Sequence, residues 1–223
     1  MNHIECKYLS SFYYFIITMK TLLFQESMDI VLVLLFLLFL SREHTNAFIF
    51  FLLTLFSLIF MYRVPYVKRQ DFPQHVISSP CYGKVLKIEE TDKTMIVKIY
   101  LNILDVHVQW FPMSGIVRTI QYKDGVFNLA HILEKSEYNE KVTTVVQNHF
   151  GTVRVDQIAG QLFRRIENWS EPGTYVKRGQ PLGMIKLSSR VDIHIPIRKA
   201  RLLVSEGDYV YGKKTPIAEW TSL

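Results

Sequence analysis

Two unbroken apolar runs dominate the first third of the chain. Residues 30–40 carry no polar side chain, and residues 47–62 carry only Thr54 and Ser57 as interior polar positions. A short polar stretch separates the runs. Each run is shorter than the roughly 20 residues that span a bilayer comfortably, so spanning requires extension to Met28 and a thinned bilayer. The pattern predicts a transmembrane helical hairpin over residues 28–62, with a single signal anchor or one long bent helix as alternatives.

The segments on either side of this hairpin carry positive charge and one further apolar patch. Within residues 1–27, the patch Phe12–Met19 predicts a segment that lies along the membrane interface. Arg63, Lys68 and Arg69 follow the second run. Because positive residues next to a membrane segment favour the cytoplasmic side, we expect the rest of the chain to lie on that side.

After Pro73 the hydrophobic period changes to that of strands. Short β-branched segments, often alternating, are broken by Gly, Pro, Asp or Asn. These segments are Val76–Ile77, Gly83–Ile88, Thr94–Ile103, Val106–Val108, Val142–Val146 and Val153–Ile158. Residues 128–139 form the one helical stretch, and the glycine repeats at 173–182 and 207–212 predict tight turns before short strands. We therefore expect a mainly β (α+β), barrel-sandwich-like domain over residues 63–223.

Composition narrows the class of partner. The chain has 49% hydrophobic residues, 21% charged residues and a net charge of +6. This charge favours an anionic partner, and beside a predicted membrane segment it indicates a phospholipid surface rather than nucleic acid. The two cysteines, Cys6 and Cys81, flank the apolar region and predict neither a disulfide framework nor a metal site.

The least ordinary segment lies near the C-terminus. Ser188 and Ser189 end one predicted strand, and Arg190, Asp192 and His194 share one face of the next. The pattern alone favours a polar turn beside a half-buried strand.

This segment is one of several blocks that occur in a fixed order along residues 63–218. The blocks are Arg63–Pro65 with Ser79–Pro80, Leu104–Gln109 with Pro112–Gly115, Gly125–Asn128, Ser136–Lys141, Gln157–Gly160 with Arg164–Ile166, and Leu182–Ile185 with Ser189–Asp192 and Pro196. Together they resemble the ordered motifs of short, membrane-anchored phosphatidylserine decarboxylases. A series of blocks in one order is far more specific than a single motif.

The resemblance implies that the chain matures by cutting itself. In this family a serine hydroxyl, here that of Ser189, attacks the carbonyl of the preceding residue, here Ser188, and the resulting ester is eliminated. The products would be a β subunit that contains residues 63–188 and an α subunit, residues 189–223, from one chain. Ser189 would become a covalent pyruvoyl group, whose ketone accepts electrons when carbon dioxide leaves, so no metal or added cofactor is implied.

The same resemblance assigns the other site residues. His107 corresponds to the histidine that acts as general base in cleavage and carries a proton in decarboxylation. Asn139 and Glu140 correspond to residues that organise the site. Arg190 corresponds to a residue that binds substrate or organises the site.

Three positions depart from the family pattern. Ser188 replaces the glycine before the cleaved serine, and Trp110 replaces an arginine or histidine after the Val-His block. The aspartate that orients the histidine is replaced by Tyr82, which is neutral at pH 7 and cannot stabilise an imidazolium as a carboxylate does. Asp105 is a candidate substitute, although it stands only two residues from His107 in the same predicted strand, where both side chains would share a face.

Other basic residues could take the role of the arginine or histidine that the family has at the position of Trp110. Arg190, Arg164 and Arg165 are the candidates for holding an anionic headgroup.

Three functions follow from these features. The first is decarboxylation of phosphatidylserine to phosphatidylethanolamine and carbon dioxide at a membrane, on its cytoplasmic side. The second is a non-catalytic relative that binds lipid or a partner. The third, a carrier-like adaptor of barrel-sandwich type, is disfavoured because no modifiable lysine stands at a hairpin tip. A homodimer is left open by the sequence.

Overall fold

The computed structural model describes residues 27–64, 70–161, 166–185 and 189–221. The chain divides into two compact units, residues 1–66 and 67–223. The predicted interfacial segment lies outside the described residues except for Ser27.

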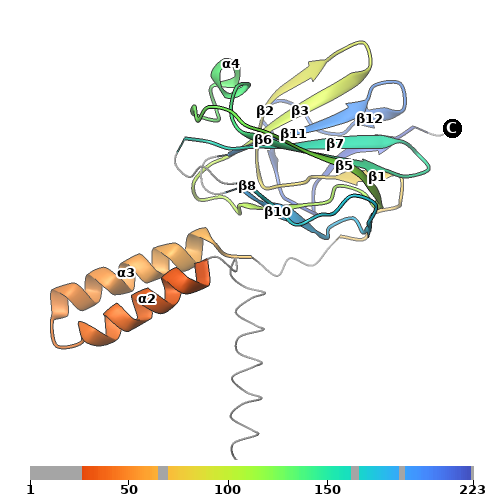
Figure 1. The fold of residues 1–223 in the computed structure, drawn as a ribbon. Helices are drawn as coiled ribbons and strands as arrows, with labels where there is room; N and C mark the ends of the chain where they lie inside the picture. Colours follow the sequence, from red (N-terminus) through yellow and green to blue (C-terminus); the bar gives the residue numbers. More distant parts are fainter. Residues whose placement is uncertain (1–26, 65–69, 162–165, 186–188, 222–223) are drawn as a thin grey trace, which may run out of the picture. The chain divides into compact units, whose positions relative to one another are not determined.

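The two apolar runs form the helices α2 (Ser27–Leu40) and α3 (Thr45–Met61), which pack side by side (Figure 1). Val31, Leu34 and Leu55 form the buried seam between them. Within the described part of the chain, no helix is long and apolar enough to cross a membrane. The transmembrane prediction is therefore not supported: at about 1.5 Å per residue the helices measure roughly 21 and 26 Å, against a hydrocarbon core of about 30 Å.

The second unit is built of antiparallel strands. The first seven are β1 (Val76–Ser78), β2 (Gly83–Glu90), β3 (Thr94–Leu101), β4 (Val108–Trp110), β5 (Gly115–Lys123), β6 (Lys141–Gln147) and β7 (Thr152–Ile158). The others are β8 (Ile166–Asn168), β9 (Tyr175–Val176), β10 (Pro181–Ile185), β11 (Ser189–Pro196), β12 (Ala200–Leu202), β13 (Tyr209–Val210) and β14 (Pro216–Trp220). The short helix α4 (Leu133–Ser136) lies between β5 and β6 in the chain. These elements confirm the mainly β fold class.

Three sheets are formed by these strands. The large sheet has the order β13-β2-β3-β11-β7-β6-β5-β9, and the small ones are β1-β14-β12 and β4-β10-β8. Figure 1 shows α4 on one side of the large sheet and β8 and β10 on the other. Alternate strand residues such as Val191 and Ile193 enter one hydrophobic core, which also contains Ile185 from β10 and Ile217 from β14. Burial of these apolar side chains is the main force that holds the sheets together.

Most of the predicted turns and strands are present in the structure. Gly173 and Gly207 have φ of 85° and 92°, which favours glycine, and each precedes one of the two-residue strands β9 and β13. The sequence predicted a strand over Val106–Val108, but β4 begins only at Val108, so His107 lies in the loop before it.

The helical prediction for residues 128–139 was wrong, since only the four residues of α4 are helical. The rest of this stretch is an irregular loop, in which Asn128 Nδ2 donates to the Lys135 carbonyl at 3.0 Å and the Asn139 side chain binds the backbone of Asn128. Asn139 Oδ1 accepts a hydrogen bond from the backbone of Asn128, and Asn139 Nδ2 donates to the Asn128 carbonyl, each at 2.8 Å. Such side-chain bonds to the backbone compete with helix formation.

Candidate active site

Ser189 is the first residue of β11 and pairs with Leu101, the last residue of β3. Its side chain is fully buried, and its Oγ has no hydrogen-bond partner among the described residues. Ser188, on the other side of the predicted cut, lies outside the described residues. A buried hydroxyl without a partner costs free energy, so it calls for a reason, and a reactive group is one such reason.

His107 is held beside the segment that leads to Ser189. The loop after β3 carries His107, whose backbone carbonyl accepts a hydrogen bond from Ile185, the last residue of β10, at 3.3 Å. The loop starts after Leu101, which pairs with Ser189 across the sheet. It continues to His107, whose carbonyl is hydrogen-bonded to Ile185. The two ends of the loop are therefore paired with Ser189 and Ile185, the described residues on either side of positions 186–188.

The tautomer of His107 follows from one contact. Nδ1 of this buried ring lies 2.8 Å from the backbone carbonyl oxygen of Asp105. A carbonyl only accepts hydrogen bonds, so Nδ1 carries a proton. In the neutral ring Nε2 then has the lone pair, which is the form required of a general base.

Asp105 contacts His107 through its backbone rather than through its carboxylate. Its Oδ2 accepts from the backbone N–H of Asn102 at 2.8 Å, and its Oδ1 accepts from the Tyr209 hydroxyl. Burial and the hydrogen bond to Asp105 raise the pKa of Tyr209, so its phenol stays protonated and donates. The sequence placed Asp105 and His107 together, but the role of Tyr209 was missed.

Tyr82, at the position of the expected aspartate, belongs to an aromatic cluster. Its ring centroid lies 5.7 Å from that of Trp110 and 5.7 Å from that of Tyr211. Trp110 is almost fully buried, and Lys213 Nζ lies 5.0 Å from its ring centroid. Both departures from the family pattern at positions 82 and 110 thus occur in one packed group.

Arg190 is fully buried and bound on several sides. Its Nε lies 2.9 Å from Asp192 Oδ1, and its Nη2 lies 3.0 Å from Asp192 Oδ2 and 2.8 Å from Glu137 Oε1. Nη1 also donates to the Ser136 hydroxyl. Burial raises the pKa of Asp192 to about 6, although Arg190 and Lys98 act in the opposite direction. The two acidic partners neutralise the guanidinium charge.

Asn139 and Glu140 lie at the same end of the sheet as Ser189. Asn139 Nδ2 donates to the carbonyl of Ala159, which follows Ile158, the β-pairing partner of Arg190. Glu140 is buried, and this burial raises the pKa of its carboxyl. Arg164 and Arg165, the other predicted headgroup contacts, lie outside the described residues.

A buried amide network, which the sequence did not reveal, supports the backbone of His107. Gln109 Nε2 donates to the His107 carbonyl at 2.6 Å, and Gln109 Oε1 accepts from Gln157 Nε2 at 2.8 Å. Asn168 Nδ2 lies within bonding distance of both Gln157 Oε1 and Thr144 Oγ1, at 3.0 and 2.8 Å. Only the presence of glutamines in two of the recognised blocks could have hinted at this network.

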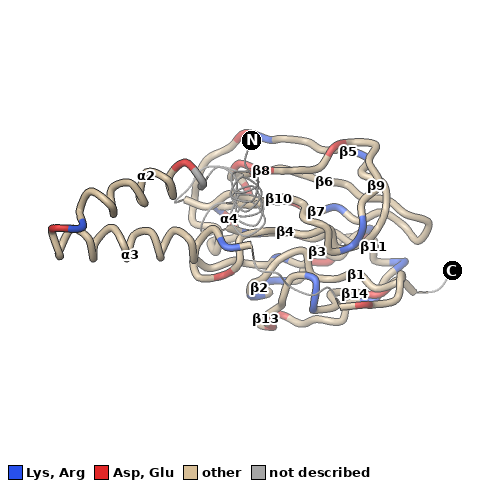
Figure 2. The backbone as a smooth tube through the Cα atoms, turned by 90° about the horizontal axis from the view of Figure 1, so that it is seen from below, with Lys and Arg blue, Asp and Glu red and all other residues tan. Residues whose placement is uncertain are grey.

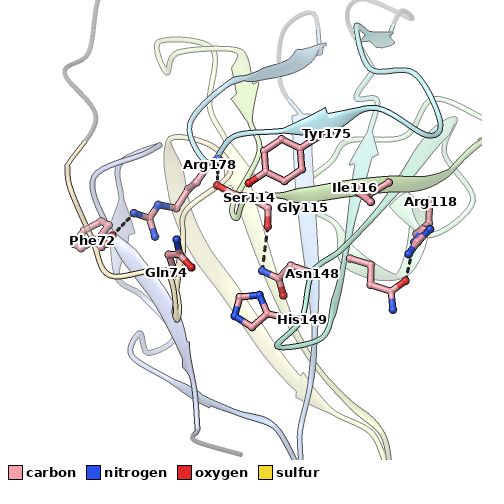
Figure 3. Close-up of a pocket in the computed structure, with 11 residues that line it drawn as sticks. Phe72, Gln74, Ser114, Gly115, Ile116, Arg118, Asn148, His149, Tyr175 and Arg178 are labelled. Carbon is pink, nitrogen blue, oxygen red and sulfur yellow. Dashed lines mark hydrogen bonds between the residues drawn. The ribbon is translucent and has the colours of Figure 1, made fainter.

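Two cavities lie elsewhere on the domain. The larger, about 520 Å³, is lined by Arg118, His149, Tyr175 and Arg178 among others (Figure 3). It lies at the Gln147 end of β6, whereas Ser189 lies at the Lys141 end, about 20 Å away along the strand. The second, about 420 Å³, lies over Asp156, Asp192 and other charged residues of the sheet. Neither is lined by Ser189 or His107.

Comparison with known proteins gives one matching family model. The matching family model is described as phosphatidylserine decarboxylase and covers residues 57–218. The chain therefore belongs to the phosphatidylserine decarboxylase family.

Individual relatives agree with this family. The phosphatidylserine decarboxylase proenzyme of Carboxydothermus hydrogenoformans is 38% identical over 176 residues, which cover 75% of this chain and 81% of the relative. The proenzyme of Desulfotalea psychrophila is 37% identical over 180 residues, which cover 77% and 83%. That of Bacteroides fragilis is 34% identical over 154 residues, which cover 66% and 67%.

Proposed function

We propose that this chain cuts itself between Ser188 and Ser189 and then decarboxylates phosphatidylserine to phosphatidylethanolamine. The observation that carries the proposal is the buried, unpartnered hydroxyl of Ser189, with His107 held by its backbone to Ile185, just upstream of the cut. The relatives described above are named proenzymes, which agrees with maturation by cleavage.

The chain's own residues supply the chemistry of the cut. His107 Nε2 takes the proton of the Ser189 hydroxyl, and Oγ attacks the Ser188 carbonyl carbon, which converts the amide into an ester and leaves an amine on residue 189. Loss of the Cα proton of residue 189 then expels the Ser188 carboxylate. Water replaces the amine nitrogen, which departs as ammonia, so residue 189 ends as a pyruvoyl group.

The surroundings of Ser189 fit such a group, because a small, buried position without a fixed hydrogen bond tolerates the change from a hydroxyl to a ketone. When formed, the group supplies a carbonyl that binds the substrate amine and takes up the electrons of the broken carboxyl bond. Within this site, His107 is placed to hold or deliver a proton. Arg190 organises the start of β11, because its guanidinium is already bound by Asp192 and Glu137.

The direct test combines a mass measurement with a lipid assay. Full-length protein purified in detergent is expected to separate into a fragment that ends at Ser188 and one of residues 189–223 with a blocked N-terminus. The cut protein should release carbon dioxide from vesicles that contain phosphatidylserine and leave an equal amount of phosphatidylethanolamine. A folded chain that stays intact and inactive would instead favour the non-catalytic relative, the alternative raised by Tyr82.

We also infer that the helical hairpin contacts lipid and keeps the domain at the cytoplasmic face of a membrane. Its large side chains, such as Phe36, Leu53 and Phe56, are 61–69% exposed. Figure 2 shows charged residues only toward the ends of α2 and α3. At one end, the Arg63 guanidinium lies 3.9 Å from the Phe60 ring centroid, a position from which it can reach anionic headgroups. Lipid contact would bring the domain to a two-tailed substrate.

Replacement of the exposed aromatic residues tests this lipid contact. The double variant Phe36→Asn with Phe56→Asn is expected to bind phosphatidylserine vesicles at least tenfold more weakly in a flotation assay, because each buried phenylalanine contributes about 1.5 kcal/mol or more. Tyr138→Asn, at a residue 70% exposed on the β domain, is the matched control and should float like the parent. Equal flotation of all three proteins would contradict the inference.

A further inference from the structure

Because position 82 is a tyrosine and not an aspartate, another group must fix the tautomer of His107. In the family that the chain resembles, that aspartate orients the histidine. Here the backbone carbonyl of Asp105 accepts a hydrogen bond from His107 Nδ1–H, with 2.8 Å between nitrogen and oxygen. A backbone acceptor orients a ring only as well as its own peptide unit is held in place, so the support of residue 105 is what matters.

The Asp105 peptide belongs to a closed turn. Asp105 N–H donates to the Asn102 carbonyl at 3.1 Å, and Asp105 Oδ2 accepts from the Asn102 N–H at 2.8 Å. Leu104 N–H donates to Asn102 Oδ1, also at 2.8 Å. The Asp105 side chain thus ties the turn at the position from which its carbonyl reaches His107.

The second carboxylate oxygen of Asp105 is held from the far end of the chain. Tyr209, in β13, donates its hydroxyl to Asp105 Oδ1 across 104 positions of sequence. Since Asp105 is buried, this bond to a carboxylate is of the stronger, charge-assisted kind. It ties the turn that follows β3 to β13, the strand at one edge of the large sheet.

The substituted position is physically connected to this anchor. The Tyr82 ring packs edge-on against Tyr211 at 5.7 Å, and Tyr211 packs against Tyr209 at 5.1 Å. The aromatic residue that replaces the aspartate therefore belongs to the cluster that places the Tyr209 hydroxyl.

We propose that Tyr209 is a positioning residue for His107: its hydroxyl fixes the Asp105 carboxylate and turn, and the Asp105 carbonyl in turn holds the Nδ1 proton. This arrangement takes over the orienting task of the aspartate absent at position 82. The proposal rests on the proposed function only for its effect on cleavage. Because Tyr209 lies after the cut and His107 before it, the small fragment would orient a catalytic side chain of the large one.

The test compares Tyr209→Phe with Tyr211→Phe in the full-length chain. Each variant loses one tyrosine hydroxyl and keeps its ring, but only Tyr209 donates to Asp105. Self-cleavage of Tyr209→Phe is expected to be roughly tenfold slower or more, from the loss of a hydrogen bond to a charged group, while Tyr211→Phe cleaves at the parent rate. If the parent chain cleaves itself, equally fast cleavage of Tyr209→Phe would overturn the proposal.

A second measurement does not depend on activity. In the uncleaved Ser189→Ala chain with ¹⁵N-labelled histidine, the His107 ring is expected to show a proton on Nδ1, and to keep it with Tyr211→Phe added. With Tyr209→Phe added, the Nε2-protonated form should appear. Asp105→Asn, which keeps a single acceptor oxygen, serves if Tyr209→Phe does not fold and should give an intermediate change.

The two readouts separate the two hypotheses. A tautomer shift in Tyr209→Phe supports the positioning role even if no chain cleaves itself, in which case only the proposed function fails. Unchanged His107 spectra in both Tyr209→Phe and Asp105→Asn overturn the positioning role, whatever the chain's activity.

Discussion

The Ser189→Ala chain is expected to remain a single uncut polypeptide, with self-cleavage and decarboxylation reduced at least a thousandfold. The substitution removes the hydroxyl oxygen that, in the proposed reaction, attacks the Ser188 carbonyl, and without it the ester cannot form and cannot be eliminated. Mass spectrometry of the purified chain after prolonged incubation measures the loss, and carbon dioxide release from phosphatidylserine vesicles measures the activity.

Ser78→Ala is the matched control for this variant. Ser78, the last residue of β1, is also a buried serine, but its Oγ donates to the Pro112 carbonyl at 3.2 Å. Its replacement should cost about 1 kcal/mol of stability through the lost hydrogen bond and leave cleavage intact. Appearance of the fragment 189–223 from the Ser189→Ala chain would show that another residue performs the attack.

The second large effect is expected for His107→Gln, with self-cleavage slowed about 10²- to 10⁴-fold, the contribution typical of a general base. Glutamine keeps a polar side chain of similar reach but has no basic nitrogen, so the Ser189 hydroxyl would lose its proton acceptor. The rate is followed by gel electrophoresis from the time the chain is released from an inclusion body or translated in vitro.

His131→Gln controls for loss of a histidine as such. The His131 ring is exposed and packs on Tyr100, with ring centroids 5.6 Å apart, and makes no contact with the loop of Asp105 among the interactions described. This control should cleave at the parent rate. If His107→Gln also cleaves at that rate, another group is the base, and the tautomer of His107 has no effect on cleavage.

The fold class was predictable because strands carry their signal locally. The alternation in Val153–Ile158 marks β7 (Thr152–Ile158) to within one residue, since one face of that strand meets the core. The local pattern failed at residues 128–139, where it predicted a helix: Asn139 binds the backbone of Asn128 through its side chain, and Asn128 Nδ2 donates to the Lys135 carbonyl. The two apolar runs form helices where the sequence predicted them, but neither described helix is long and apolar enough to span a membrane, so the spanning prediction is not supported.

The candidate site was identified from the sequence by its ordered blocks, which include Ser189 and His107. The blocks could not predict which groups each of these side chains would hydrogen-bond. Asp105 was considered as a direct substitute for the aspartate absent at position 82, but its carboxylate is bonded to Asn102 and Tyr209 and only its carbonyl meets His107.

The sequence by itself determined that the chain has an apolar helical part and a β-rich part, and its resemblance to a family predicted which serine and histidine form the candidate site. The tertiary structure alone decided that Ser189 Oγ is buried without a described partner, that Arg190 is neutralised by Asp192 and Glu137, and that Tyr209 anchors Asp105. The physical reason is range: hydrophobic period is a property of neighbouring residues, whereas burial and hydrogen bonding depend on strands that meet only when the sheet forms.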